Sequence, residues 1–183
     1  MPMTVIYDAN VLYPNTLRDL LIRLARAGVV RARWTDQILD EVTEALRRNR
    51  PDIDAAKIRR LRELINAAVR DCLVTDYQDL TDTIDLPDKD DRHVVAAAIA
   101  AEAHSIITWN MRDFPADRLA AHGLRAQTPD DFVCALIEDA RPVVWSCIQQ
   151  IADARTLRPL TAHDVLAQLE RDGLIRAVAR IGI

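Results

Sequence analysis

Short apolar runs alternate with amphipathic stretches up to about residue 138, and this alternation constrains the fold more than any other feature of the chain. The apolar, β-branched run at 3–7 and the run at 105–109 indicate buried strands, and the run at 29–34 indicates another strand. Between them, stretches such as 12–27 and 35–48 repeat apolar residues at helical spacing. Because strands separated by helices pair as parallel neighbours, the pattern predicts a central parallel sheet with helices on both faces.

The remaining elements of this part of the chain are expected to continue the alternation. An alanine-dense helix over 92–103 has small side chains that suit close packing on a sheet. The other expected elements are a helix over 54–70, a short strand over 72–75, a short helix over 117–121, a strand over 124–127 and a helix from Pro129.

From about residue 139 the pattern changes to helices without strands, expected at 142–154, 161–171 and 174–180. We therefore expect two parts, a sheet domain over 1–138 and a helical C-terminal extension over 139–183. The first helix of the extension carries an apolar stripe that needs a partner. We expect it to cover the sheet domain or to form an interface with another chain. The stripe consists of Val143, Val144, Ile148 and Ile151.

Composition places the chain among ordinary folded proteins of a reducing compartment. Half of the residues are hydrophobic, which is enough for a core without disulfides. The three cysteines are widely spaced and form no CxxC pair, so neither a disulfide framework nor a zinc site is indicated. Nothing resembles a signal peptide or a membrane-spanning segment. We expect a cytoplasmic protein with no membrane association.

Charge is unevenly distributed along the chain. The net charge is −4, yet residues 1–62 carry 12 basic and 8 acidic residues, which leaves 12 basic and 20 acidic residues in 63–183. A nucleic-acid surface is therefore expected only as a local patch. One basic cluster could contact RNA phosphates, bind an acidic partner or remain a solvated face, and these readings stay open. The cluster consists of Arg47, Arg48, Arg50, Lys57, Arg59, Arg60 and Arg62.

Four acidic residues are candidates for a site, and two of them, Asp8 and Asp113, lie where parallel sheets bind ligands, beyond the carboxyl ends of their strands. Asp8 follows the first strand, Asp113 lies in the loop after the strand at 105–109, and Asp91 begins the alanine-dense helix. Glu41 lies in the middle of the helix at 35–48. Each acid alone is explained as a helix cap, a turn residue or a solvated residue. Together they suit a hard cation such as Mg²⁺ or Mn²⁺.

Four stretches of sequence, taken in order, resemble the motifs of the PIN-domain family. The resemblance is strongest to the branch of VapC-type toxins from bacterial toxin–antitoxin pairs and extends over roughly residues 3–138. The stretches run from Ile6 to Leu12, from Ile38 to Val42, from Leu86 to Ala98 and from Ile107 to Phe114.

The resemblance implies a three-layer α/β/α PIN-like fold with a central parallel sheet. It also implies a metal-dependent ribonuclease, in which Mg²⁺ or Mn²⁺ activates water for attack on the RNA phosphodiester without a covalent protein nucleophile. RNA and a cognate antitoxin are the expected partners, and a homodimer is an expected assembly. Carried over residue by residue, the catalytic and metal-binding quartet is Asp8, Glu41, Asp91 and Asp113, with Asn10, Thr108 and Asn110 as supporting polar residues.

Two neighbouring residues could be confused with this quartet. Asp90 is a rival to Asp91 as the ligand at the start of the helix, and Asp91 is preferred because the corresponding acid of the family precedes the small-residue helix by one turn. His93 is expected to point away from the carboxylates, since it lies two residues beyond Asp91 on that helix. We therefore predict a structural role for His93.

Two other functions compete with the ribonuclease reading. A Mg²⁺-dependent α/β phosphohydrolase of the aspartyl-phosphate type would need a second aspartate two residues after Asp8, and position 10 is Asn10. A catalytically silent PIN-like module that only binds RNA or protein would not need all four acids. The ribonuclease is therefore the favoured prediction.

Overall fold

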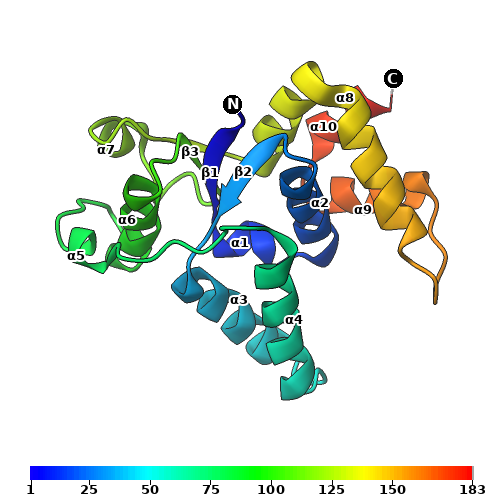
Figure 1. The fold of residues 1–183 in the computed structure, drawn as a ribbon, viewed down its shortest axis with the longest axis horizontal. Helices are drawn as coiled ribbons and strands as arrows, with labels where there is room; N and C mark the ends of the chain where they lie inside the picture. Colours follow the sequence, from blue (N-terminus) through cyan, green and yellow to red (C-terminus); the bar gives the residue numbers. More distant parts are fainter. Residues whose placement is uncertain (183) are drawn as a thin grey trace.

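The protein contains a four-stranded parallel sheet, as the computed structural model of residues 1–182 shows (Figure 1). Its strands are β1 (Met3–Tyr7), β2 (Val30–Arg33), β3 (Ser105–Ile107) and β4 (Arg125–Gln127), in the order β2-β1-β3-β4. All three pairings are parallel. The predicted central parallel sheet is thus confirmed.

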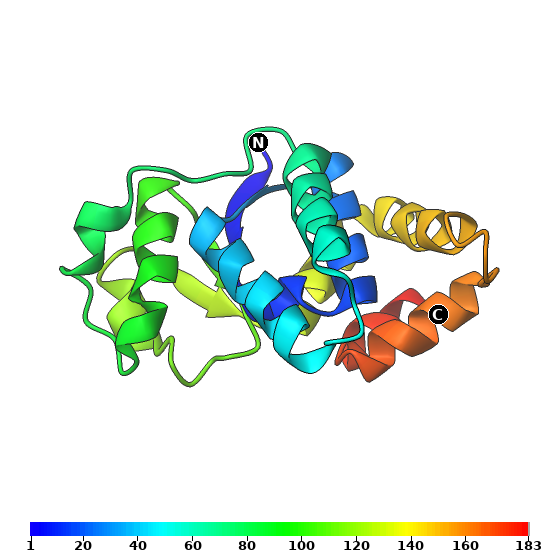
Figure 2. The same cartoon turned by 90° about the horizontal axis from the view of Figure 1, so that it is seen from below.

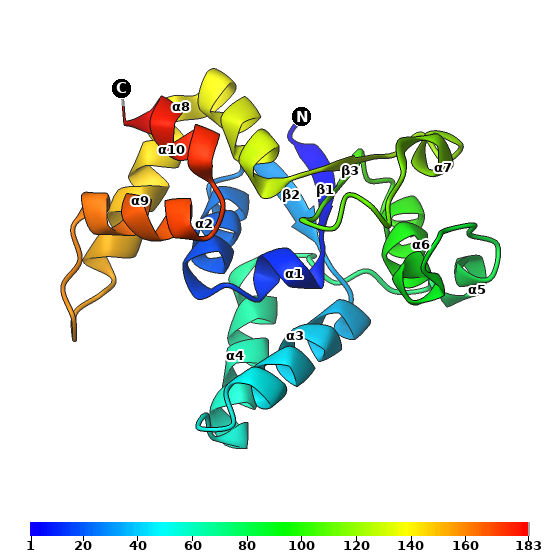
Figure 3. The same cartoon turned by 180° about the vertical axis from the view of Figure 1, so that it is seen from behind.

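Helices cover both sides of the sheet. The short helices α5 and α7 and the alanine-rich α6 lie on one side, and α2 lies on the other with α8, α9 and α10 (Figures 1 and 3). This arrangement confirms the predicted three-layer fold with C-terminal helices. The bounds are α1 (Ala9–Leu12), α2 (Asn15–Arg26), α3 (Asp36–Asn49), α4 (Ala55–Ala68), α5 (Gln78–Thr81), α6 (Arg92–Ala100), α7 (Ala116–Ala120), α8 (Pro129–Asp153), α9 (Ala162–Arg171) and α10 (Ile175–Ile181).

Two local predictions were wrong in detail. The helix predicted over 12–27 is two helices, α1 and α2, separated where Pro14 adopts an extended conformation (φ −67°, ψ 128°). The strand predicted over 72–75 is reduced to one parallel bridge between Trp34 and Leu73. The chain therefore turns at Pro14, and α1 is free to lie across the end of β1.

The core fixes the carboxyl end of β1. Tyr7, the last residue of β1, is fully buried and stacks on Trp34 with ring centroids 6.4 Å apart. Its hydroxyl donates a hydrogen bond to the carbonyl oxygen of Leu21 in α2 (3.2 Å). Phe132 of α8 meets the same ring edge-on. The tight packing of Tyr7 therefore fixes where the backbone of Asp8, the next residue, begins.

Helix α8 bends at its middle. Ala140 has non-helical dihedrals (φ −145°, ψ 42°), two residues before Pro142, whose ring cannot donate the helical hydrogen bond and displaces the preceding turn. Along its length α8 contacts α2, α9 and α10. Val144, Ile148 and Ile151 of the predicted apolar stripe are buried in the common core, so the chain itself covers this face. The division at 138/139 falls beside the bend and remains a prediction.

Among the described residues, no helix is both long and apolar enough to cross a membrane. Even α8, with its 25 residues, is not apolar enough over a sufficient length to cross a bilayer.

The hairpin of α3 and α4 lies beyond the carboxyl ends of the strands, and the view from below looks onto it (Figure 2). Helix α3 follows β2 closely and is capped by Thr35, whose hydroxyl accepts a hydrogen bond from the amide of Ile38 (3.0 Å). The helix also contacts α1. This path brings α3 to the edge of the sheet where the predicted acids lie.

Candidate active site

Asp8 joins the end of β1 to the start of α1. One of its carboxylate oxygens accepts a hydrogen bond from the amide of Ala9 (2.8 Å) and caps α1. The other accepts from the hydroxyl of Thr108 (2.8 Å) and from the side-chain amide of Asn10 (3.1 Å). Burial raises the pKa of Asp8, although the hydrogen bonds from Thr108 and Ala9 oppose this shift. The carboxylate of Asp8 is thus both the N-cap of α1 and the acid at the end of β1.

Thr108 links the loops that follow β1 and β3. Its hydroxyl donates to Asp8 and accepts from the side chain of Asn10 (2.9 Å) and from the amide of Asn110 (3.0 Å). Asn10 in turn accepts from the amide of Trp109 (3.0 Å). Because the Thr108 hydroxyl uses its one donor and both acceptor positions, its orientation is fixed by the fold. The predicted supporting residues Asn10, Thr108 and Asn110 therefore form one network.

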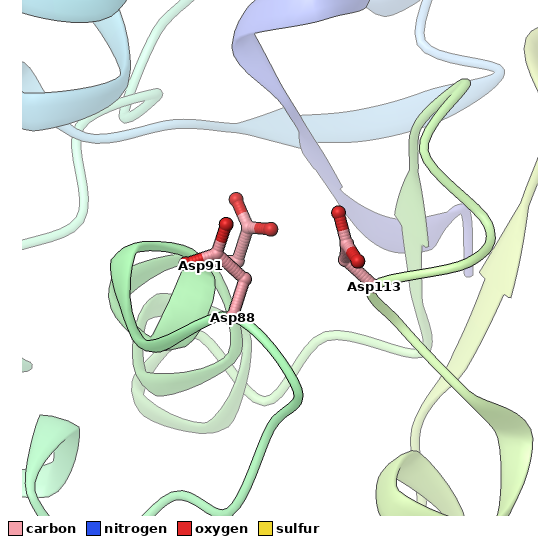
Figure 4. Close-up of side chains that lie close together, drawn as sticks. All are labelled: Asp88, Asp91 and Asp113. Atoms are coloured by element: carbon pink, nitrogen blue, oxygen red, sulfur yellow. The ribbon is translucent and has the colours of Figure 1, made fainter.

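Three aspartates lie close together, as Figure 4 shows. Asp88 and Asp91 come from the turn that leads into α6, and Asp113 faces them from the loop after β3. One carboxylate oxygen from each lies within 4.8 Å of the others. The side-chain amide of Asn110 donates to Asp113 (2.8 Å) and more weakly to Asp91 (3.4 Å). The structure thus brings Asp91 and Asp113 together and adds Asp88.

The charges of the predicted quartet act on one another. The pKa of Asp91 is raised to about 6, first by burial and then by the negative charges of Asp8, Asp88, Asp113 and Glu41. Asp8 and Glu41 lie outside the closest group of oxygens but within its electrostatic field. All four predicted acids therefore belong to one neighbourhood, centred on Asp91.

The donor set fits a hard divalent cation. Mg²⁺ binds oxygen at about 2.0–2.1 Å, so two oxygens on one ion are at most about 4.2 Å apart. The oxygens of Asp88, Asp91 and Asp113 are within 4.8 Å, and small side-chain rotations would bring them to that separation. Carboxylates without nitrogen or sulfur ligands favour Mg²⁺ or Mn²⁺ over zinc.

Glu41 reaches the site through a contact with His93. Its carboxylate oxygen lies 2.6 Å from Nε2 of His93, which is 3% exposed on α6. The two atoms lack the alignment of a ring N–H hydrogen bond, and neither ring nitrogen of His93 has a hydrogen-bond partner among the described residues. The prediction that His93 points away from the carboxylates was wrong, because the side chain of Glu41 on α3 reaches His93 on α6.

Sequence reasoning named Asp90 and missed Asp88. Asp90 is exposed, and only its backbone amide takes part, donating to the Asp88 carboxylate (2.9 Å). Asp88 precedes Asp91 by three residues, and a short 3₁₀ turn over Lys89–Asp91 places both on one side. That spacing was visible in the sequence as a signal for Asp88.

The basic cluster after Glu41 is largely engaged in ion pairs. Arg47 lies 3.7 Å from Glu44, and Arg50 forms two hydrogen bonds with Asp52. Arg48 has no ion pair among residues 1–182. The acidic neighbours favour a solvated face over a strong phosphate grip. A shallow groove of mixed charge nevertheless runs from Glu41 to Arg47 and Arg48, so a weaker contact with RNA stays a prediction.

The fold and the site together define an α/β protein with a carboxylate cluster at the carboxyl edge of its sheet. The family model described as PIN domain matches residues 4–112, more than half of the chain, and the protein belongs to the PIN-domain family. A second model, described as VapC50 C-terminal domain, matches residues 129–182.

A curated protein with VapC50 in its name, like the second family model, is similar to part of this chain. The protein called "Putative ribonuclease VapC50" of Mycobacterium tuberculosis (strain ATCC 25618 / H37Rv) is 35% identical over 79 residues, which cover 43% of this chain. The matched segment spans 47% of that relative, about half of its length.

Proposed function

We propose that this protein is a Mg²⁺- or Mn²⁺-dependent endoribonuclease of the cytoplasm and the toxin of a toxin–antitoxin pair. The observation that carries the proposal is the cluster of Asp88, Asp91 and Asp113, with Asp8 and Glu41 in its electrostatic field. Its position at the carboxyl edge of a PIN-domain sheet and the name of the curated relative support the same reading.

The chain's own residues would hold the metal and orient the phosphate. Asp88, Asp91 and Asp113 would be the principal ligands, Asp8 and Glu41 would complete the negative field, and Thr108 and Asn110 would keep the carboxylates in place. A bound divalent ion supplies activation of water and stabilisation of charge on the phosphate oxygens. Asn10 cannot serve as a second acid, since its side chain is engaged with Asp8, Thr108 and Trp109. This engagement counts against the aspartyl-phosphate alternative.

The test of this function is RNA cleavage by the purified protein with and without metal. We expect cleavage with Mg²⁺ or Mn²⁺, none in EDTA, and recovery when the metal is restored, because the carboxylates alone cannot offset the charge of the phosphate. Gel analysis of a structured RNA with single-stranded loops would report the cut sites. Full activity after rigorous metal removal would contradict the mechanism. Metal binding without any cleavage would instead favour a silent binding module.

Asp88 and Asp90 provide a matched pair of substitutions. Asp88→Asn should weaken Mg²⁺ binding about tenfold to a hundredfold, the range found when a group supporting a metal site is lost. Asp90→Asn, two residues away, should leave it unchanged because the Asp90 side chain lies outside the cluster. Calorimetric titration of Mg²⁺ into both variants measures the difference. Equal affinities would place the metal elsewhere.

Metal affinity should depend on pH through Asp91. Because its pKa is raised to about 6, the proton competes with the metal below that pH. The apparent affinity should fall about tenfold for each pH unit below about 6 and level off above it. Mg²⁺ titrations at a series of pH values check this, and Asp91→Asn should remove the dependence. A flat profile in the wild type would exclude Asp91 as a ligand.

A further inference from the structure

A second charged feature lies at the other end of the sheet. A cavity of about 410 Å³ opens beside the edge strand β2, between the end of α2 and the end of α4. Its size falls within the range of small-ligand sites. Four arginines line it, Arg26, Arg31, Arg33 and Arg70, together with a single acid, Asp71.

These arginines differ from most others in the protein. None of the four forms an ion pair or a side-chain hydrogen bond with residues 1–182, whereas Arg23, Arg62 and Arg118 each contact a carboxylate. The cavity therefore carries uncompensated positive charge in a chain whose net charge is −4. An anion would meet little competition from the protein's own acids there.

Two of the arginines come from the edge strand itself. Arg31 and Arg33 are two residues apart in β2, so their side chains leave the same face of the strand. Charged residues on an edge strand also prevent unwanted strand pairing. That role needs only a solvated guanidinium, but Nε of Arg33 is buried and lacks a hydrogen-bond acceptor among the described residues. A buried donor of this kind calls for an acceptor inside the cavity.

The lining favours phosphate as that acceptor. Guanidinium groups match the geometry of phosphate oxygens with paired hydrogen bonds. The side chains of Ala25 and Val69 add apolar wall, and Gly28 (φ +78°) has no neighbour within 4 Å of the position of a Cβ atom. A phosphate with an attached sugar or base therefore has both charge partners and space.

We propose that this cavity, here called the β2-edge pocket, binds a phosphate group of a nucleotide or of an RNA chain. It is separate from the carboxylate cluster, because Pro2 and Gly28 border it at the amino ends of β1 and β2 while Asp8 follows the carboxyl end of β1. The five residues of β1 span about 17 Å along the strand, at about 3.3 Å per residue. The proposal does not depend on the nuclease activity.

Binding to metal-free protein tests the pocket without any cleavage. In EDTA, calorimetry would measure the affinity of the protein for ADP and for a short single-stranded RNA. The double variant Arg31→Gln, Arg33→Gln should bind the effective probe at least about tenfold more weakly than the wild type, since charge-assisted hydrogen bonds are lost. Arg158→Gln removes an exposed arginine that has no ion pair within residues 1–182 and lies outside the pocket, and this variant should bind as the wild type does.

The two probes distinguish the source of the phosphate. Binding of ADP that is lost in the double variant supports a nucleotide ligand. Binding of RNA without ADP, lost in the same variant, supports an RNA backbone contact. Should the double variant fail to fold, Arg70→Gln changes an exposed residue outside the sheet and serves in its place. The proposal is overturned if the wild type binds neither probe at millimolar concentration, or if the pocket variants bind as the wild type does.

Discussion

Asp8→Asn is expected to lower RNA cleavage at least about a hundredfold, the scale of losing one preorganised electrostatic contact. It should also leave the metal-free protein as stable as the wild type or more so. Asp8 is 5% exposed, and its charge lies in the field of Glu41. Asparagine keeps one acceptor oxygen for the surrounding donors and removes the buried charge. Loss of function without loss of stability would mark Asp8 as part of a charged site.

The pKa shifts of the site predict how the stability of the metal-free protein changes with pH. Burial raises the pKa of Asp8, and the pKa of Asp91 is raised to about 6. A carboxyl group with a raised folded-state pKa stabilises the fold while it is protonated, below its ordinary value of 3.8, and this stability is lost as the pH rises through the folded-state pKa. The metal-free wild type should therefore lose stability between about pH 4 and about pH 6. Asp8→Asn should lose less.

Thermal melts with and without Mg²⁺ measure both effects. Mg²⁺ should raise the Tm of the wild type at neutral pH by binding the folded cluster, and this increase should shrink in Asp8→Asn. Asp90→Asn provides the control, because its exposed carboxylate lies outside the cluster. A variant that still cleaves RNA, or that melts well below the metal-free wild type, would show that Asp8 acts only as the cap of α1.

Local sequence signals were sufficient for most of the sheet. The runs that became β1, β2 and β3 are short and bounded by turn residues, so each could be recognised as a strand from its own sequence. Because the strand ends meet at one edge, the positions of Asp8 and Asp113 followed from the sheet. The strand predicted over 72–75 was wrong because tertiary contacts decide strand pairing there, and only the single bridge between Trp34 and Leu73 forms.

Side-chain relations across helices were beyond sequence reasoning. The contact between Glu41 and His93 depends on how α3 is placed relative to α6, which no periodic pattern records. Asp88 joined the cluster because a 3₁₀ turn precedes α6. The β2-edge pocket combines the ends of α2 and α4 with an edge strand, and these segments are distant in the chain. Such contacts depend on the packing of whole elements, whereas propensity describes one element at a time.

The C-terminal helices contact the candidate active site through one glycine. Gly173 lies between α9 and α10 with φ +108°, and a Cβ added there would lie 2.7 Å from Cη2 of the Trp109 ring. Trp109 stands between Thr108 and Asn110, and its amide donates to Asn10. The helix α10 beyond this glycine is held by buried Asp130, which accepts from the amide of Ala177 (2.8 Å). The backbone at Gly173 therefore has little freedom to move away from the Trp109 ring.

Gly173→Ala should therefore disturb the loop that carries the site. The positive φ costs about 1–2 kcal/mol for any residue with a Cβ, and the clash with Trp109 adds about 1–3 kcal/mol of overpacking. Gly123→Ala is the matched control, since Gly123 also has a positive φ (+68°) but no neighbour within 4 Å. We expect a lower Tm, an altered Trp fluorescence and weaker Mg²⁺ binding in Gly173→Ala than in Gly123→Ala. If the two variants melt together and bind Mg²⁺ equally, the C-terminal helices do not position the carboxylate network.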